Sequence, residues 1–313
     1  MNHHTLSDFR VAHHAAIDAL VTQSIAALLH RGIVTLARVA QDGTRVRAAA
    51  GAGSFRRGPT LQACLRTARK QVERTQRQAD APVSAATAAQ ARAARERLAH
   101  VEAALAVLPE VEAVKTKQGK KAQSAPRVST TDPDARVMKM ADGGFRPAYN
   151  IQLATDVVGR AIVGLQVTNV GSDRGQLTPM LAEIEQRTGR SLATYLVDGG
   201  YLNHAAIQAA AARGIAVYAP LEKPKRDRAP DVPARQDTPA IAAWRAHMAT
   251  DEAKRILKDR GATAEWVNAD ARTHRTLDRI PVRGLPKVHT WALWIVLAHN
   301  MLRLTDIIPH VMT

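Results

Sequence analysis

Two aspartates stand where strands would carry them to one edge of a sheet. Asp198 follows the apolar run "ATYLV" and precedes two glycines, at the point where a strand turns toward a helix. Asp42 lies in "LARVAQDGTRVRA", whose period of two indicates a strand with Asp42 and Thr44 on the same side. Carboxylate oxygens are the hard ligands that Mg²⁺ prefers, and two such ions bind a phosphodiester, activate water and stabilise the leaving oxygen. These residues therefore indicate metal-dependent phosphoryl chemistry.

Each aspartate also has a purely structural interpretation. Asp-Gly is a common hairpin signal, so Asp42 also fits a turn. Asp198 fits the N-cap of the next helix, although Asn203 is better placed for that role. Gly199 and Gly200 favour the metal site, because residues without a Cβ atom leave room for a phosphodiester to approach the backbone.

The N-terminal half of the chain alternates between helical and strand periods. Apolar residues at helical spacing predict a helix within residues 6–31, and "GIVTLARVAQDGTRVRAAAG" predicts the strand that follows. Residues 60–115 are rich in Ala, Arg, Gln and Glu and are interrupted near "ADAPVSAAT", which predicts a helical hairpin. The basic stretch "VKTKQGKKAQSAPRVS" fits either a mobile loop that contacts phosphate or a solvated linker.

The C-terminal half predicts a sheet with helices between its strands. "YNIQLATD" and "AIVGLQVTN" predict a hairpin with Gly159 at the turn, and the amphipathic helix after it ends at Gly189. The strand "ATYLV", a helix from Asn203 and the strand "IAVYAP" follow. Residues 222–243 are Pro-rich and charged and indicate a loop or lid, and two further helices complete the chain, "DEAKRILKDRG" and "HTWALWIVLAHNMLRL".

The order of these elements predicts an α/β fold of RNase H-like type. We expect a mixed sheet flanked by helices, with a helical insertion after the first strand. In such a sheet an acid on the first strand, an acid at the end of the fourth and a Glu on a late helix gather at one edge. The predicted domains are a helical lead-in, 1–31, and a catalytic domain, 32–313, with its helical insertion at 58–126 and its charged loop at 222–243.

The composition indicates a polyanionic partner. Lys and Arg number 44 against 28 Asp and Glu, a formal charge of +16, which makes nucleic acid the default partner. No apolar run approaches the roughly 20 residues of a membrane-spanning helix, and the opening "MNHHTLSDFR" is no signal peptide. We therefore expect a soluble cytoplasmic protein. The single cysteine, Cys64, excludes an internal disulfide and a four-thiolate metal site.

Five motifs, taken in order, are similar to those of one protein family. They are "TLSDFR", "QDGTRVRAAAGAGSFRR", "TTDPDARVMK" with "PAYNIQLATD", "VDGGY", and "VRGLPKVHTWALWIVLAHNMLRL". Over nearly its whole length the chain resembles the DDE transposases of bacterial insertion sequences, of the IS5 and IS1182 groups. Each motif alone is weak, and their common order carries the resemblance.

The resemblance implies three catalytic acids that bind metal. Asp42 is the first, Asp198 the second, and Glu265 in "RGATAEWVNADARTHRTL" the third. The local sequence alone does not mark Glu265, because a Glu in a charged helix usually faces solvent. Asp132 and Asp134 of "TTDPDAR" compete with Asp42 for the role of first acid, or else hold a turn at the intervening proline.

Two further aspartates are expected to lie outside the site. Asp156 fits a turn and Asp173 fits a helix start. The family places basic residues shortly before and about seven residues after the third acid, where this chain has Arg260 and Arg272. The basic residues expected to bind DNA are Arg45, Arg47, Lys120, Lys121, Arg260, Arg272, Arg283 and Lys287.

The resemblance also implies a reaction and its partners. It implies Mg²⁺, replaceable by Mn²⁺, hydrolysis at the ends of the element, and attack of the freed 3′-hydroxyl on target DNA. The expected partner is double-stranded DNA, bound by a homodimer that associates with the nucleoid, with no role for a membrane. Family members carry a longer helical region before "TLSDFR", so the alternative is a truncated remnant that binds DNA without transposing. A host-adapted nucleic-acid-binding protein without metal is a third hypothesis.

Overall fold

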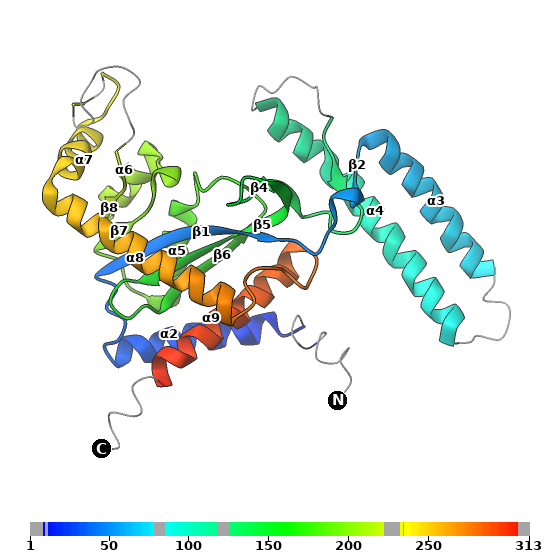
Figure 1. The fold of residues 1–313 in the computed structure, drawn as a ribbon, viewed down its shortest axis with the longest axis horizontal. Helices are drawn as coiled ribbons and strands as arrows, with labels where there is room; N and C mark the ends of the chain where they lie inside the picture. Colours follow the sequence, from blue (N-terminus) through cyan, green and yellow to red (C-terminus); the bar gives the residue numbers. More distant parts are fainter. Residues whose placement is uncertain are drawn as a thin grey trace. The chain divides into compact units, whose positions relative to one another are not determined.

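The protein forms two compact units (Figure 1). The computed structural model describes residues 9, 12–77, 85–117, 125–221, 232–233 and 235–305. The first unit comprises Met1–Val46, Asn150–Asp278 and Val288–Thr313, and the second comprises Arg47–Tyr149 and Arg279–Lys287. The predicted domain boundary after residue 31 does not coincide with this division, and it stays a prediction.

A mixed sheet forms the centre of the first unit. Its strands follow the order β6–β5–β1–β7–β8, with β5 and β6 antiparallel and β7 parallel to both β1 and β8. The predicted mixed sheet is thereby confirmed, including the hairpin that contains Gly159. The strands are β1 (Arg38–Arg47), β5 (Phe145–Asp156), β6 (Ile162–Thr168), β7 (Thr194–Leu196) and β8 (Ala216–Tyr218).

Helices cover both faces of this sheet. Along β1, Asp42 and Thr44 bond to residues of α8 (Asp251–His274), which lies across β1 in Figure 1. Gln41 points the other way and donates to the carbonyl of Gln176, directly before α5 (Leu177–Thr188). Alternate residues of one strand therefore meet helices on opposite faces. The other helices of this unit are α2 (His14–His30), α6 (His204–Ala212), α7 (Pro239–Ala249) and most of α9 (Leu285–Thr305).

Apolar packing and helix caps fix these elements locally. β5 is buried from Pro147 to Asp156. A Cβ atom on Gly164 of β6 would lie 2.6 Å from the sulfur of Met180 in α5, so only glycine allows that helix to pack so closely. α5 ends as predicted at Gly189, whose φ of 64° suits a residue without a Cβ atom.

The second unit contains the helical hairpin that the sequence predicted. Helices α3 (Gly58–Arg77) and α4 (Ala85–Lys117) pack together, and Leu61, Ala104 and Val128 form a buried cluster there. Strands β2 (Phe55–Arg56) and β3 (Val128–Ser129) pair antiparallel beside them, and β4 (Arg136–Lys139) pairs with the beginning of β5.

One predicted loop boundary is wrong. Helix α7 begins at Pro239, within residues 222–243, because Thr238 caps its N-terminus and proline is well suited to the first helical turn. Residues 222–231 and 234 of that loop lie outside the described residues, as do Lys120 and Lys121 of the basic stretch. Within the described part of the chain, no helix is both long enough and apolar enough to cross a membrane.

Candidate active site

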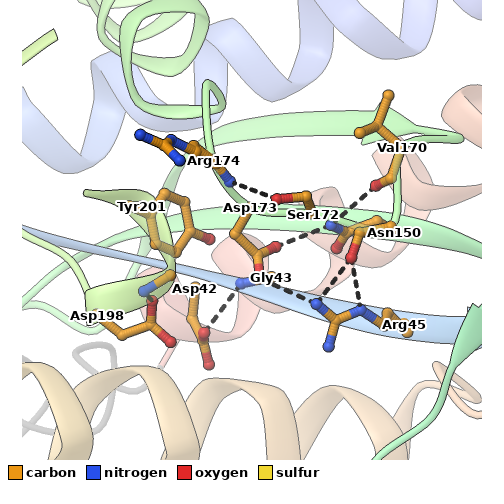
Figure 2. Close-up of polar contacts among 12 residues, drawn as sticks. Asp42, Gly43, Arg45, Asn150, Val170, Ser172, Asp173, Arg174, Asp198 and Tyr201 are labelled. Atoms are coloured by element: carbon orange, nitrogen blue, oxygen red, sulfur yellow. Dashed lines mark hydrogen bonds and ion pairs between the residues drawn. The ribbon is translucent and has the colours of Figure 1, made fainter. Parts of the chain in front are cut away.

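The pairing of β1 with β7 brings the first two predicted acids together. The parallel register aligns Arg38 with Thr194 and Ala40 with Leu196, and the same offset of 156 residues places Asp42 level with Asp198. Residues level on neighbouring parallel strands lie about 5 Å apart and point to the same face. Figure 2 shows both carboxyl groups on the same side of β1. Each carboxylate therefore lies within the electrostatic reach of the other.

Asp42 lies in a setting that disfavours its charge. Its Oδ1 accepts a hydrogen bond from the backbone N–H of Gly43 at 3.0 Å, and its Oδ2 accepts one from Asn268 Nδ2 at 3.0 Å. Burial raises the pKa of Asp42, Arg260 opposes that shift, and the charge of Asp198 adds to it. A bound cation would relieve both the burial penalty and the repulsion between the carboxylates. The two aspartates thus fit a divalent metal as hard oxygen donors.

Asp198 has a structural role and remains partly exposed. Its Oδ1 accepts from the N–H of Gly200 at 2.7 Å and caps the short 3-10 helix Gly199–Tyr201. A side chain on Gly200 would crowd this carboxylate, since its Cβ would lie 2.9 Å from Asp198 Oδ1. Asn203 caps α6 instead, as the sequence predicted. Asp198 is therefore a cap, but of a single turn, and it stays partly exposed.

Helix α8 presents a polar face to β1. Asn268 bonds to Asp42, and Arg272 donates to the hydroxyl of Thr44, which confirms that Asp42 and Thr44 face the same way. Glu265 lies one turn before Asn268 on this helix and is exposed. No three His, Cys, Asp or Glu side chains of the described residues are close enough together to bind a metal ion. The structure thus brings Asp42 and Asp198 together and does not add Glu265 to them.

Asp173 lies beside the site, although the sequence analysis placed it outside. Its Oδ1 accepts from Asn150 at 2.8 Å, and its Oδ2 pairs with Arg45 at 3.1 Å (Figure 2). Its Oδ1 also accepts from Gln152 at 2.7 Å. Its charge also adds to the raised pKa of Asp42, after burial, Arg260 and Asp198. Asp173 is therefore a correction to the predicted site: it is a neighbour of Asp42 whose own charge is compensated. By contrast, Asp156 is the last residue of β5 and holds the turn that follows, where it accepts from the N–H of Gly159.

A buried polar network supports β1 behind the two acids. Gln152 joins Gln41 at 2.9 Å, accepts from the hydroxyl of Tyr201 and donates to Asn150 at 3.1 Å. Tyr195 of β7 donates to Gln41 at 2.8 Å, so the network links β7 to β1 and β5. Such networks favour one arrangement of the strands when their members are satisfied.

Gly43→Ala is expected to disturb this support. A Cβ atom at Gly43 would lie 2.2 Å from Gln152 Nε2 and 2.3 Å from Asp173 Oδ1, so the network must move. We expect a loss of about 1–3 kcal/mol in the free energy of unfolding, measured by urea titration. Gly53→Ala is the matched control, because a Cβ atom there meets nothing within 4 Å. Equal stability of the two variants would contradict the packing argument.

Asp132 and Asp134, the alternatives to Asp42 as first acid, accept hydrogen bonds from backbone N–H groups of the second unit and the start of α9. Asp132 is fully buried, and its Oδ1 accepts from the hydroxyl of Tyr149 at 2.7 Å and from the N–H of Gly284 at 3.2 Å. Asp134 accepts from the N–H of Leu285 at 2.8 Å, at the beginning of α9. Burial raises the pKa of Asp132, and the hydrogen bond from Tyr149 opposes the shift.

The predicted DNA-binding residues differ in how far their charged groups already bond to other groups of the protein. Arg45 is committed within the protein to Gly171 and Asp173, and Arg272 bonds to Thr44 while remaining exposed. Arg260 lies close enough to Asp42 to affect its pKa. In the second unit Arg47 and Lys287 are exposed, and the exposed Arg283 donates to the carbonyl of Ala49.

Comparison with known proteins identifies the family. A family model described as a transposase DDE domain matches residues 117–301. No curated protein and no solved structure matches the chain. The matched segment contains Asp198 and Glu265, and Asp42 precedes it. Because the match covers more than half of the 313 residues, the chain belongs to the DDE transposase family.

Proposed function

We propose that this protein is the transposase of an insertion sequence, which cuts DNA at the ends of its element and joins them to target DNA. The observation that carries the proposal is the register of β1 and β7, which makes neighbours of Asp42 and Asp198. Counted along the chain, β1 and β7 are the first and fourth strands of the first unit's sheet, and the helical hairpin follows the first. This order supports an RNase H-like fold.

Asp42, Asp198 and Glu265 are the proposed metal ligands. When bound, Mg²⁺ or Mn²⁺ supplies an activated water and stabilises charge on the phosphate. Asp42 on β1 and Asp198 just after β7 provide the fixed carboxylates, and the polar network holds these two strands in register. Glu265 is the third acid, carried by α8, the helix that is bonded to β1 through Asn268 and Arg272.

Double-stranded DNA is the proposed substrate. A formal charge of +16 favours binding to a polyanion, and Arg260 and Arg272 on α8 place positive charge beside the two acids. These arginines would neutralise phosphates next to the one that reacts. Binding as a homodimer and action on the nucleoid in the cytoplasm belong to the same proposal.

One observation favours the alternative of a transposase remnant. Glu265 is exposed and forms no three-acid cluster with Asp42 and Asp198 in the part of the chain that the structure describes. A remnant would bind DNA through its positive charge without cutting it. The retained Asp42–Asp198 pair supports the active enzyme, because a protein that only binds DNA has no use for two adjacent carboxylates beside phosphate.

Cleavage of DNA that carries the element's own ends separates the two functions. We expect Mg²⁺ or Mn²⁺ to support cleavage by the full chain, and Ca²⁺ to allow binding with little cleavage because its looser coordination positions water poorly. The measurements are product formation on labelled end fragments and DNA affinity under the same conditions. Binding of end DNA without cleavage in either Mg²⁺ or Mn²⁺ would establish the remnant.

A further inference from the structure

Asn268 occupies an unusual position in the candidate site. It is only 9% exposed, and its Nδ2 donates to Asp42 Oδ2 at 3.0 Å. Its other polar atom, Oδ1, is buried and has no hydrogen-bond partner among the described residues. A buried acceptor without a partner costs free energy, and native proteins keep few of them. The unpaired oxygen calls for a function beyond linking α8 to β1.

The chemistry of an amide provides such a function. One end of the Asn side chain donates hydrogen bonds and the other accepts them, and half a turn about its last torsion exchanges the two ends. A free carboxylate at Asp42 needs a donor, which Nδ2 supplies. When Asp42 binds a cation, the cation requires oxygen, and Oδ1 supplies it. Asn268 can therefore supply the donor that the metal-free site needs and the oxygen that the metal-bound site needs.

The position of Asn268 on α8 agrees with this role. It lies three residues after Glu265 and four before Arg272, so all three share one face of the helix. Arg272 already contacts Thr44, the residue that shares a side of β1 with Asp42. Asn268 is thus the point where the helix carrying the third acid touches the first acid.

We propose that Asn268 is a metal-positioning residue that donates from Nδ2 to Asp42 in the metal-free site and turns Oδ1 toward the divalent cation when Asp42 binds one. The inference rests on the proposed function, since it assumes that Asp42 is a metal ligand. This role adds the amide oxygen of Asn268 to the carboxylate ligands of the cation. It also makes the orientation of a side chain on α8 depend on whether the cation is bound.

Mn²⁺ binding by the full chain without DNA tests the role, by calorimetry or by electron paramagnetic resonance. Asn268→Leu keeps the size of the side chain and removes both polar ends. We expect its Mn²⁺ affinity to fall about 10- to 100-fold, as for other residues that orient metal ligands. The melting temperature of the metal-free variant should stay near that of the wild type, because removing the unpaired oxygen stabilises the fold while losing the hydrogen bond to Asp42 destabilises it.

Asn268→Asp supplies the second measurement, and it applies even if the leucine variant does not fold. It keeps an oxygen and adds a negative charge beside Asp42, so the metal-free melting temperature should fall and Mn²⁺ should restore it. Its Mn²⁺ affinity should match or exceed that of the wild type. Asn203→Leu, which alters the cap of α6, is the control and should leave Mn²⁺ affinity unchanged.

The outcomes separate this inference from the proposed function. If Asp198→Asn weakens Mn²⁺ binding and Asn268→Leu does not, Asn268 is only structural and the metal site stands. A lower melting temperature for Asn268→Leu with unchanged affinity would lead to the same conclusion. If the wild type binds no Mn²⁺, both the metal site and the role of Asn268 are wrong.

Discussion

Asp198→Asn is expected to reduce DNA cleavage by orders of magnitude while DNA affinity stays the same or rises slightly. The amide keeps an oxygen that can accept from the N–H of Gly200, so the 3-10 turn at Gly199–Tyr201 remains capped. The variant loses one negative charge of the Asp42–Asp198 pair, and with it a ligand for the cation. It also removes a charge that repels phosphate.

The measurements are cleavage of end-containing DNA in Mg²⁺ and in Mn²⁺, and DNA affinity in Ca²⁺. Asp251→Asn is the matched control, because it removes the same charge from an exposed position in the first turn of α8. We expect that control to cut DNA at the wild-type rate. Equal cleavage by Asp198→Asn and the wild type would exclude a catalytic role for Asp198.

The pairing of the first two acids could be predicted because it depends on short-range patterns. The period of two in β1 fixed which side Asp42 shares with Thr44, and the apolar run before Asp198 marked the end of β7. Parallel strands then required the two residues to meet at one edge. Neither inference needed the position of any loop.

Asp173 was missed because its location depends on contacts between distant segments. It lies in the loop before α5, and only the folded sheet brings that loop to Asn150, Gln152 and Arg45. A signal was present in the sequence. Asn150 and Gln152 are two residues apart and alternate with the apolar Ile151 and Leu153, so they share one face of the strand and require a polar partner there.

Two residues of α8, Glu265 and Asn268, could not be identified as site residues from the local sequence alone. Glu265 was identified only through the family resemblance, because an exposed Glu on a charged helix carries no local signal. Asn268 was not identified at all, since nothing in the sequence shows which residue of a helix will touch a given strand. Helix α7 was not predicted and its first residues were assigned to the loop, because Pro-rich composition outweighed the capping signal of Thr238.

Asp42→Asn, compared with Asp132→Asn, is expected to settle which residue is the first catalytic acid. The change at Asp42 should reduce cleavage by orders of magnitude, because the site loses a metal ligand. It should leave the metal-free protein equally stable or more stable at neutral pH. Burial raises the pKa of Asp42, so its ionised form is less favourable in the folded protein than in the unfolded chain, and the amide removes that cost.

The same change at Asp132 should leave cleavage per folded molecule near the wild-type value. Its amide oxygen can still accept from Tyr149 and Gly284, so the segment at the start of α9 stays bound. Asp132→Ala should instead lower the free energy of unfolding by about 1–3 kcal/mol, because it leaves the buried hydroxyl of Tyr149 and the half-buried N–H of Gly284 without their acceptor. Cleavage by Asp42→Asn at the wild-type rate, together with its loss in the stable Asp132→Asn, would transfer the role of first acid to Asp132. The fold favours the opposite outcome, because the strand that carries Asp42 is the one paired in register with the strand before Asp198.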